Sequence, residues 1–80
     1  MDRRKALHYF IEDSFNVGIG GDLYFNYVET KNDWDYYYRE EISYGVKGEF
    51  NIYISSDGQQ MYRKTNNMGV IKEDFYKRVR

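Results

Sequence analysis

The chain has 80 residues, a formal net charge of −1 at pH 7, and no cysteine. This length suits one domain, residues 1–80, with a modest core, and the absence of cysteine excludes disulfides and thiolate metal sites. Ten tyrosines and an aromatic content of 20% must therefore supply much of the apolar surface that stabilises the fold.

We expect no membrane or export signal in this sequence. No apolar run approaches the roughly 20 residues that a membrane-spanning helix needs. The N-terminus, from Met1 to Lys5, continues into mixed polar and apolar residues and lacks the apolar centre of a signal peptide. We therefore expect a complete cytoplasmic protein with no membrane partner.

A helix is predicted near the N-terminus. Apolar residues recur there at helical spacing and form one stripe: Ala6, Leu7, Phe10, Ile11 and Phe15. Asp2 is a suitable N-cap, and glycines at positions 18, 20 and 21 prevent the helix from continuing much beyond residue 16. Because Phe15, Val17 and Ile19 also alternate, residues 14–20 remain open between helix, strand and loop.

Residues 22–65 have the pattern of an antiparallel meander of about four strands. Residues 31–33 are a predicted turn, and Gly45 and Gly48 bracket a second reversal. The pair Asp57-Gly58 is typical of a tight hairpin turn, because both residues accept the positive φ angles that such a turn requires.

The same pattern predicts which residues share a strand face. A two-residue loop at Asp57-Gly58 would set Ser56 opposite Gln59, Ile54 opposite Met61, and Tyr53 opposite Tyr62. Alternation places a set of four aromatic residues and one isoleucine on one face of the strand that begins at Trp34, with Tyr37 on the other face. That set is Trp34, Tyr36, Tyr38, Ile42 and Tyr44.

A second helix is predicted after Asn66 and Asn67, either of which could cap it. Ile71, Phe75 and Val79 lie at i, i+4 and i+8, which is the spacing of an apolar helix stripe. The predicted fold is therefore α+β, with an N-terminal helix, an antiparallel meander of about four strands and a C-terminal helix. Both helices are expected on one face of the sheet.

Catalytic and ligand-binding constellations are weak in this sequence. His8 is the only histidine and can pair with Glu12 at i, i+4, but it supports neither a catalytic triad nor a multi-histidine metal site. The segment Gly18–Gly21 lacks the lysine and hydroxyl residue that end a phosphate-binding loop. We expect a non-enzymatic protein that holds no cofactor and no metal.

The aromatic residues of the sheet are the strongest candidate site. Tyrosine is enriched at protein interfaces because it combines a large apolar ring with a hydroxyl group. With helices on one face of a sheet, the other face stays exposed to water unless a partner covers it. The predicted protein-binding residues are Trp34, Tyr36, Tyr37, Tyr38, Tyr53 and Tyr62, with an acidic rim of Asp33, Asp35, Glu40 and Glu41.

Charge is distributed unevenly along the chain. Residues 22–57 hold eight acidic and three basic residues, whereas residues 58–80 hold six basic and two acidic residues. Acidic groups beside the aromatic strands repel phosphate, whereas they attract a basic protein surface. The leading hypothesis is a small protein-binding module, for example a phage or mobile-element inhibitor that acts on a host protein that processes nucleic acid.

Two alternatives remain open. In the first, the chain binds nucleic acid and stacks bases on Tyr53 and Tyr62. The phosphates would then be held by the basic residues near the C-terminus, which are Arg63, Lys64, Lys72, Lys77, Arg78 and Arg80. In the second, two copies form a homodimer in which the exposed rings cover each other.

Overall fold

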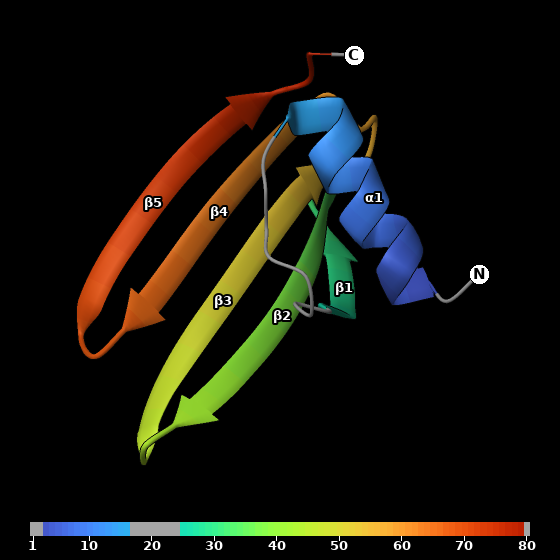
Figure 1. Ribbon diagram of the computed structural model, residues 1–80. Coiled ribbons are helices and arrows are strands. Elements are labelled where there is room, and N and C mark those ends of the chain that lie inside the picture. The colour runs from blue at the N-terminus through green and yellow to red at the C-terminus, as the bar shows by residue number, and fades with distance from the viewer. Residues whose placement is uncertain (1–2, 17–24, 80) are drawn as a thin grey trace.

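A five-stranded antiparallel sheet and one helix form the described part of the chain (Figure 1). The computed structural model describes residues 3–16 and 25–79. In chain order the elements are α1 (Arg3–Phe15), β1 (Asn26–Lys31), β2 (Trp34–Ser43), β3 (Val46–Ser55), β4 (Gln60–Asn67) and β5 (Val70–Lys77). The strand order is β1-β2-β3-β4-β5, so each strand lies beside the next one in the sequence.

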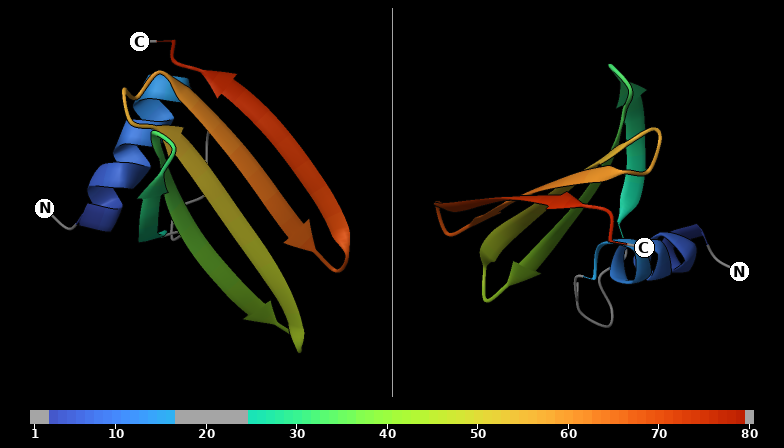
Figure 2. Two further views of the ribbon diagram at one scale, coloured as in Figure 1. Left: turned by 180° about the vertical axis from the view of Figure 1, so that it is seen from behind. Right: turned by 90° about the horizontal axis from the view of Figure 1, so that it is seen from above.

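The helix packs against one face of the sheet, over the strand ends nearest the β3–β4 loop, and no described segment packs against the other face (Figures 1 and 2). We call the covered side the helix face, which carries Ile52 and Ile54, and the uncovered side the open face, which carries Tyr36 and Tyr53. The core lies between α1 and the helix face. Its buried side chains are Ile11, Phe15, Phe25, Ile52, Ile54 and Met61.

The N-terminal helix forms because its apolar stripe packs on the sheet. Ile11 and Phe15 are buried, and Leu7 and Phe10 pack against the core cluster. α1 ends at Phe15, and Asn16 follows with a φ of 54°, a left-handed conformation that asparagine tolerates at helix ends. Among the described residues, no helix is long and apolar enough to cross a membrane.

The chain after β5 returns to α1. The Val79 N–H donates a hydrogen bond of 2.7 Å to the Ser14 carbonyl, close to the C-terminal end of the helix. The Arg78 guanidinium lies 5.6 Å from the centre of the Phe10 ring, within the range of a cation–π contact. These contacts join the segment that follows β5 to the only described helix.

Three hairpins close through two-residue turns in which both central residues have positive φ. The turns are Asn32-Asp33, Tyr44-Gly45 and Met68-Gly69, and this is type I′ geometry, whose twist matches that of the flanking strands. The predicted turn at residues 31–33 is confirmed. The second reversal uses Tyr44-Gly45, while Gly48 lies inside β3.

The connection between β3 and β4 is longer than predicted. β3 ends at Ser55 and β4 begins at Gln60, which leaves a four-residue loop. Gly58 has a φ of 74° and donates its N–H to the Ser55 carbonyl at 2.7 Å. The Asp57 carboxylate accepts hydrogen bonds from the Ser55 hydroxyl at 2.6 Å and from the Gln59 N–H at 3.1 Å. These bonds lower the pKa of Asp57 from its usual value.

Beyond this loop the predicted register is confirmed. Ile54 pairs with Met61, and Tyr53 pairs with Tyr62. The predicted pairing of Ser56 with Gln59 is wrong, because both residues belong to the loop. A two-residue and a four-residue loop with the same centre between Asp57 and Gly58 give the same pairs further along the strands.

The predicted C-terminal helix is wrong, because residues 70–77 form β5, which pairs with β4 along its whole length. The spacing of Ile71 and Phe75 at i and i+4 fits a helix, but four residues are also two full repeats of a strand. The turn at Met68-Gly69 and the β-branched and aromatic residues after it favour the strand. Asn66 and Asn67 belong to β4 and cap no helix.

The predicted α+β fold class is therefore wrong. The described chain is mostly sheet, with five strands instead of about four and with one helix instead of two on the helix face. Four sequence predictions lie outside the described residues: the Asp2 cap, the glycine-rich segment from Gly18 to Gly21, the start of the strand pattern at residues 22–24, and any role of Arg80. Of residues 14–20, Ser14 and Phe15 belong to α1 and Asn16 follows it.

The turn at Met68-Gly69 offers a test of β5 at a position with no close neighbours. A Cβ added at Gly69 would meet nothing within 4 Å, so Gly69→Ala changes only backbone strain. At a φ of 81° we expect this substitution to lower the free energy of unfolding in urea by about 1–2 kcal/mol. In a helix the same substitution would stabilise the chain, so a gain would contradict the hairpin.

Met68→Asn is the matched change at the other turn position. Met68 has a φ of 55°, and asparagine tolerates this conformation better than methionine. We expect Met68→Asn to raise the free energy of unfolding by up to about 1 kcal/mol. Met68→Leu is the control and should leave it unchanged, because leucine meets the same strain.

Candidate functional site

The strand register aligns one aromatic residue from each of four strands on the open face. Tyr36 of β2 pairs with Tyr53 of β3, Tyr53 pairs with Tyr62 of β4, and Tyr62 pairs with Phe75 of β5. Residues paired across antiparallel strands project from the same face, so the four rings form one line across the sheet. We call these four residues the aromatic row.

The rings of the aromatic row contact one another in sequence. The centres of Tyr36 and Tyr53 are 4.6 Å apart and the rings are nearly parallel, at 12°. Tyr53 and Tyr62 lie 5.7 Å apart, and Tyr62 and Phe75 lie 4.6 Å apart, each pair tilted by 37°. These separations fall within the range of favourable aromatic pairs. The row is therefore a continuous apolar strip four strands wide.

One end of this strip is exposed, and a shallow hollow lies beside it. Phe75 is 76% exposed, whereas Tyr36, Tyr53 and Tyr62 are half-buried by their neighbours. The hollow measures about 240 Å³ and is lined by Trp34 together with Tyr53, Tyr62 and Phe75. An apolar side chain of a partner could be seated there between rings from four strands.

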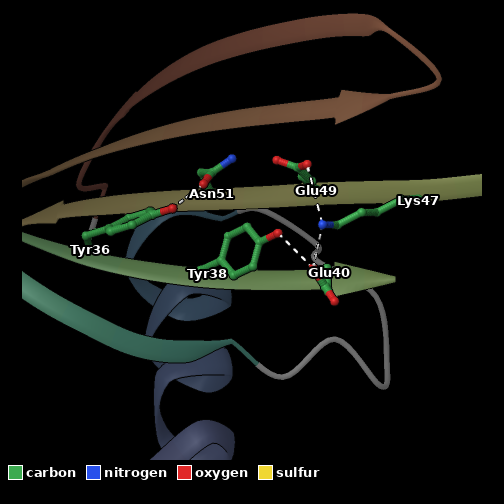
Figure 3. Close-up of polar contacts among 6 residues, drawn as sticks. All are labelled: Tyr36, Tyr38, Glu40, Lys47, Glu49 and Asn51. Carbon is green, nitrogen blue, oxygen red and sulfur yellow. Dashed lines mark hydrogen bonds and ion pairs between the residues drawn. The ribbon is translucent and has the colours of Figure 1, made fainter. Parts of the chain in front are cut away.

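Polar groups of the open face hold the first ring in place. The Tyr36 hydroxyl donates a hydrogen bond to the Asn51 side-chain oxygen (Figure 3). The Asn51 amide in turn donates to the Lys64 carbonyl at 3.3 Å. Partial burial, followed by the nearby Tyr53 hydroxyl, raises the pKa of Tyr36. Tyr36 therefore stays a neutral donor over a wider pH range than a free tyrosine.

A small ionic cluster lies beyond the row on β2 and β3 (Figure 3). The Lys47 ammonium lies 3.1 Å from Glu40 and 4.0 Å from Glu49, and the Tyr38 hydroxyl donates to Glu40 at 3.1 Å. The hydrogen bonds from Lys47 and Tyr38 lower the pKa of Glu40, and the bond to Glu40 raises the pKa of Lys47. Partial desolvation and then the bond to Glu40 raise the pKa of Tyr38.

The charge of the open face is balanced. The register places four acidic and four basic residues of the described strands on it: Glu29, Glu40, Glu49, Glu73, Lys31, Lys47, Lys64 and Lys77. Tyr62 donates a hydrogen bond to Glu73, which raises the tyrosine pKa. The open face is therefore an aromatic strip between mixed charges and not a strongly acidic surface.

The structure divides the predicted protein-binding residues between locations. Those on the open face are Trp34, Tyr36, Tyr38, Tyr53, Tyr62 and Glu40. Those on the helix face are Tyr37, Asp35 and Glu41, which pair with Ile52, Ile54 and Gly48. Asp33 lies in the turn between β1 and β2. The predicted acidic rim is thus not one continuous surface.

Tyr37 belongs to the packing of the helix face. It packs against the core cluster, and its ring meets the edge of the Tyr27 ring at 5.7 Å. Burial, followed by the nearby Asp35 carboxylate, raises the pKa of Tyr37. Asp35 accepts a hydrogen bond of 2.6 Å from the Thr30 hydroxyl. Sequence alternation separated Tyr37 from Tyr36 but did not say which of them α1 would cover.

The predicted nucleic-acid-binding residues also divide between the two faces. Lys64 and Lys77 lie on the open face, whereas Arg63 and Lys72 lie on the helix face. The Arg63 guanidinium contacts the Tyr76 ring at 5.6 Å and Asp74 at 3.7 Å, and Arg78 contacts Phe10. No helix collects these side chains on one side, so the described basic residues form no single phosphate-binding surface.

Sequence reasoning missed Phe75 as a surface aromatic, because residues 70–77 were assigned to a helix. The β-branched pair Val70-Ile71 and the aromatic pair Phe75-Tyr76 after Gly69 were the available signal. It also missed Tyr44 and Met68, two large exposed side chains that occupy left-handed turn positions. Both line a hollow of about 420 Å³ at the end of the sheet away from the β3–β4 loop.

The remaining sequence candidates form no larger site. The His8 Nε2 lies 2.8 Å from the Glu12 carboxylate, as the i, i+4 spacing predicted. Within residues 3–16 and 25–79, no group of three His, Cys, Asp or Glu side chains is placed to hold a metal ion. The open face, with its row of contacting rings and the hollow beside them, is therefore the candidate site.

Comparisons with known protein families, curated proteins and solved structures found no match to this chain. Its function is therefore inferred from the residues and their geometry.

The stacked pair Tyr36–Tyr53 should contribute to stability beyond the area that it buries. In a double-mutant cycle with Tyr36→Thr and Tyr53→Thr, we expect a coupling energy of about 0.5–1.5 kcal/mol from urea unfolding. Threonine keeps a high strand propensity while removing the ring. A control cycle of Tyr36→Thr with Phe75→Thr, which lie at opposite ends of the row, should give a coupling near zero.

The ionic cluster predicts how the stability contributed by Glu40 changes with pH. Because its pKa is lowered in the folded chain, Glu40 contributes stability above the ordinary glutamate pKa and loses it as the pH falls through the lowered value. Lys47→Gln should raise the Glu40 pKa toward its usual value in an NMR titration. The control Lys31→Gln should leave it unchanged, and an equal effect of both substitutions would contradict the specific pair.

Proposed function

We propose that this chain is a non-enzymatic protein-binding module and that its working surface is the open face of the sheet. The observation that carries the proposal is the aromatic row. Four rings in contact span four strands on a face that no described segment covers. Tyrosine, tryptophan and arginine dominate the energetics of protein interfaces, and two of these types line the hollow beside Phe75.

The shape of the surface supports a protein partner over a small substrate. The hollow is shallow and lies on an open sheet, whereas small-molecule sites bury most of the ligand in a cleft or cavity. A strip of aromatic rings bordered by polar and charged side chains has the layout of an interface core and its rim. The partner should offer an apolar patch with charges of both signs around it.

The balanced charge restricts the proposal to protein binding in general. Inhibition of a protein that processes nucleic acid would be favoured by a surface that imitates the negative charge of a nucleic acid. Equal numbers of Glu and Lys on the open face do not produce such a field. The same balance gives little attraction for phosphate, so nucleic-acid binding is the rival outcome that the experiment must test.

The test uses Trp34→Thr, which removes a ring at the β2 end of the hollow and keeps strand propensity. Proteins retained by the wild-type chain from an extract of its source cells are identified, purified and titrated in a calorimeter. We expect Trp34→Thr to weaken binding at least about tenfold, the size of an interface hot spot. The control Tyr9→Ala removes a 57% exposed ring from α1 and should leave binding unchanged.

Two results would contradict the proposal. One is a specific partner that binds Trp34→Thr and the wild-type chain equally well. The other is salt-sensitive binding of labelled single- or double-stranded oligonucleotides that falls in Lys64→Ala and Lys77→Ala, which would favour the nucleic-acid alternative. Each variant must show the wild-type free energy of unfolding before its binding is compared.

A further inference from the structure

β5 is an edge strand that offers backbone groups for pairing. It is the last strand in the sheet, on the side away from α1 (Figures 1 and 2). In the hairpin closed by Met68-Gly69, Val70 faces Asn67 in a hydrogen-bonded pair, and such pairs recur at every second residue. The Arg78 N–H donates to the Gln59 carbonyl at 2.9 Å, so even-numbered residues still bond toward β4 at the far end of the hairpin. The N–H and C=O groups of Ile71, Glu73 and Phe75 therefore point outward, away from β4.

The side chains along this edge are also exposed. Val70 is 60% exposed, Ile71 is 55% exposed and Phe75 is 76% exposed. An exposed edge of eight residues with apolar side chains on both faces is a template for pairing with another strand. What pairs with it depends on the order of side chains along β5.

That order is complementary to itself. When two antiparallel copies of β5 are centred on Glu73, Ile71 faces Phe75 of the second copy and Val70 faces Tyr76. Lys72 faces Asp74 of the second copy, and every one of these pairs occurs twice about the symmetry axis. Centring on Lys72 or Asp74 instead would set charged residues against apolar ones, with Glu73 facing Ile71 or Phe75 of the second copy.

We propose that two copies of this chain associate through the outer edges of β5, in the antiparallel register centred on Glu73. Six backbone hydrogen bonds then form between the outward groups of Ile71, Glu73 and Phe75 in the two copies. The two-fold axis is normal to the sheet, so both open faces lie on the same side of a ten-stranded sheet. Phe75 at the end of each aromatic row contacts Ile71 of the other copy.

One pair opposes association in this register. The two Glu73 carboxylates meet at the axis, and like charges directly opposite each other are destabilising. Each carboxylate has partners within its own chain, because Tyr62 donates a hydrogen bond to it and Lys64 is its neighbour across β4 and β5. The repulsion lowers the affinity without changing the register, and it makes Glu73 the position at which association is best tested.

The first experiment compares Glu73→Pro with Glu73→Gln by analytical ultracentrifugation from about 10 µM to about 1 mM, the range suited to a small, weak interface. The wild-type chain should show a reversible monomer–dimer equilibrium. Glu73→Pro removes an outward N–H and should abolish the dimer without breaking a bond to β4. Glu73→Gln keeps that N–H, removes the repulsion and should tighten association about twofold to fivefold.

The second experiment tests the register and does not depend on proline. Lys72→Glu alone sets the introduced carboxylate against Asp74 of the second copy, and Asp74→Lys alone sets the introduced ammonium against Lys72. Each variant should therefore associate more weakly than the wild-type chain. Mixed together, the two variants restore opposite charges at both positions and should form a heterodimer. A wild-type monomer throughout the concentration range, or a mixture no stronger than its separate components, would overturn the proposal.

These outcomes are separate from those of the proposed function. Trp34 lies on β2, three strands away from β5, so Trp34→Thr should leave the dimer intact. Glu73→Pro should remove the dimer and leave the hollow beside Trp34 in place.

Discussion

The pairing of β2 with β3 is the constraint on which the rest of the structure depends. It sets Tyr36 opposite Tyr53 and Tyr37 opposite Ile52, and so decides which rings α1 covers and which face water. The turn at Tyr44-Gly45 fixes this register, because a two-residue type I′ turn leaves no freedom to slip. A shift of one residue would move Tyr37 to the open face and bring Trp34, Tyr36 and Tyr38 under the helix.

The aromatic row stabilises the fold as well as forming a surface. Only a few large side chains are fully buried in the described chain, namely Ile11, Ile52 and Met61. Cross-strand ring pairs add stability to a sheet with so small a core, because each pair contributes about 0.5–1.5 kcal/mol to the free energy of unfolding. Exposed tyrosines are therefore compatible with a stable chain, since each ring that lies beside another is already partly removed from water.

Strand alternation and turn chemistry made part of this arrangement predictable. They identified the N-terminal helix stripe, the Tyr53/Tyr62 pair and the separation of Tyr37 from its neighbours. They did not identify β5, because a four-residue repeat satisfies a helix and a strand alike. Turn residues as large as Tyr44 and Met68 also gave no signal, since type I′ turns usually have asparagine, aspartate or glycine at that position. The exposed end of the candidate site, Phe75, was lost with β5.

The Phe75 end of the aromatic row differs from the centre in how much ring surface is exposed to water. Tyr53 and Tyr62 each contact a ring on both sides, so their replacement changes the sheet itself. Phe75 contacts Tyr62 alone among the ring pairs of the row and is 76% exposed, so most of its surface is still able to gain from burial. At about 25 cal/mol per Å² of apolar area, burial of such a ring favours any contact that covers it. The central rings therefore build the platform, and the exposed ring at the β5 end has the most to contribute to binding.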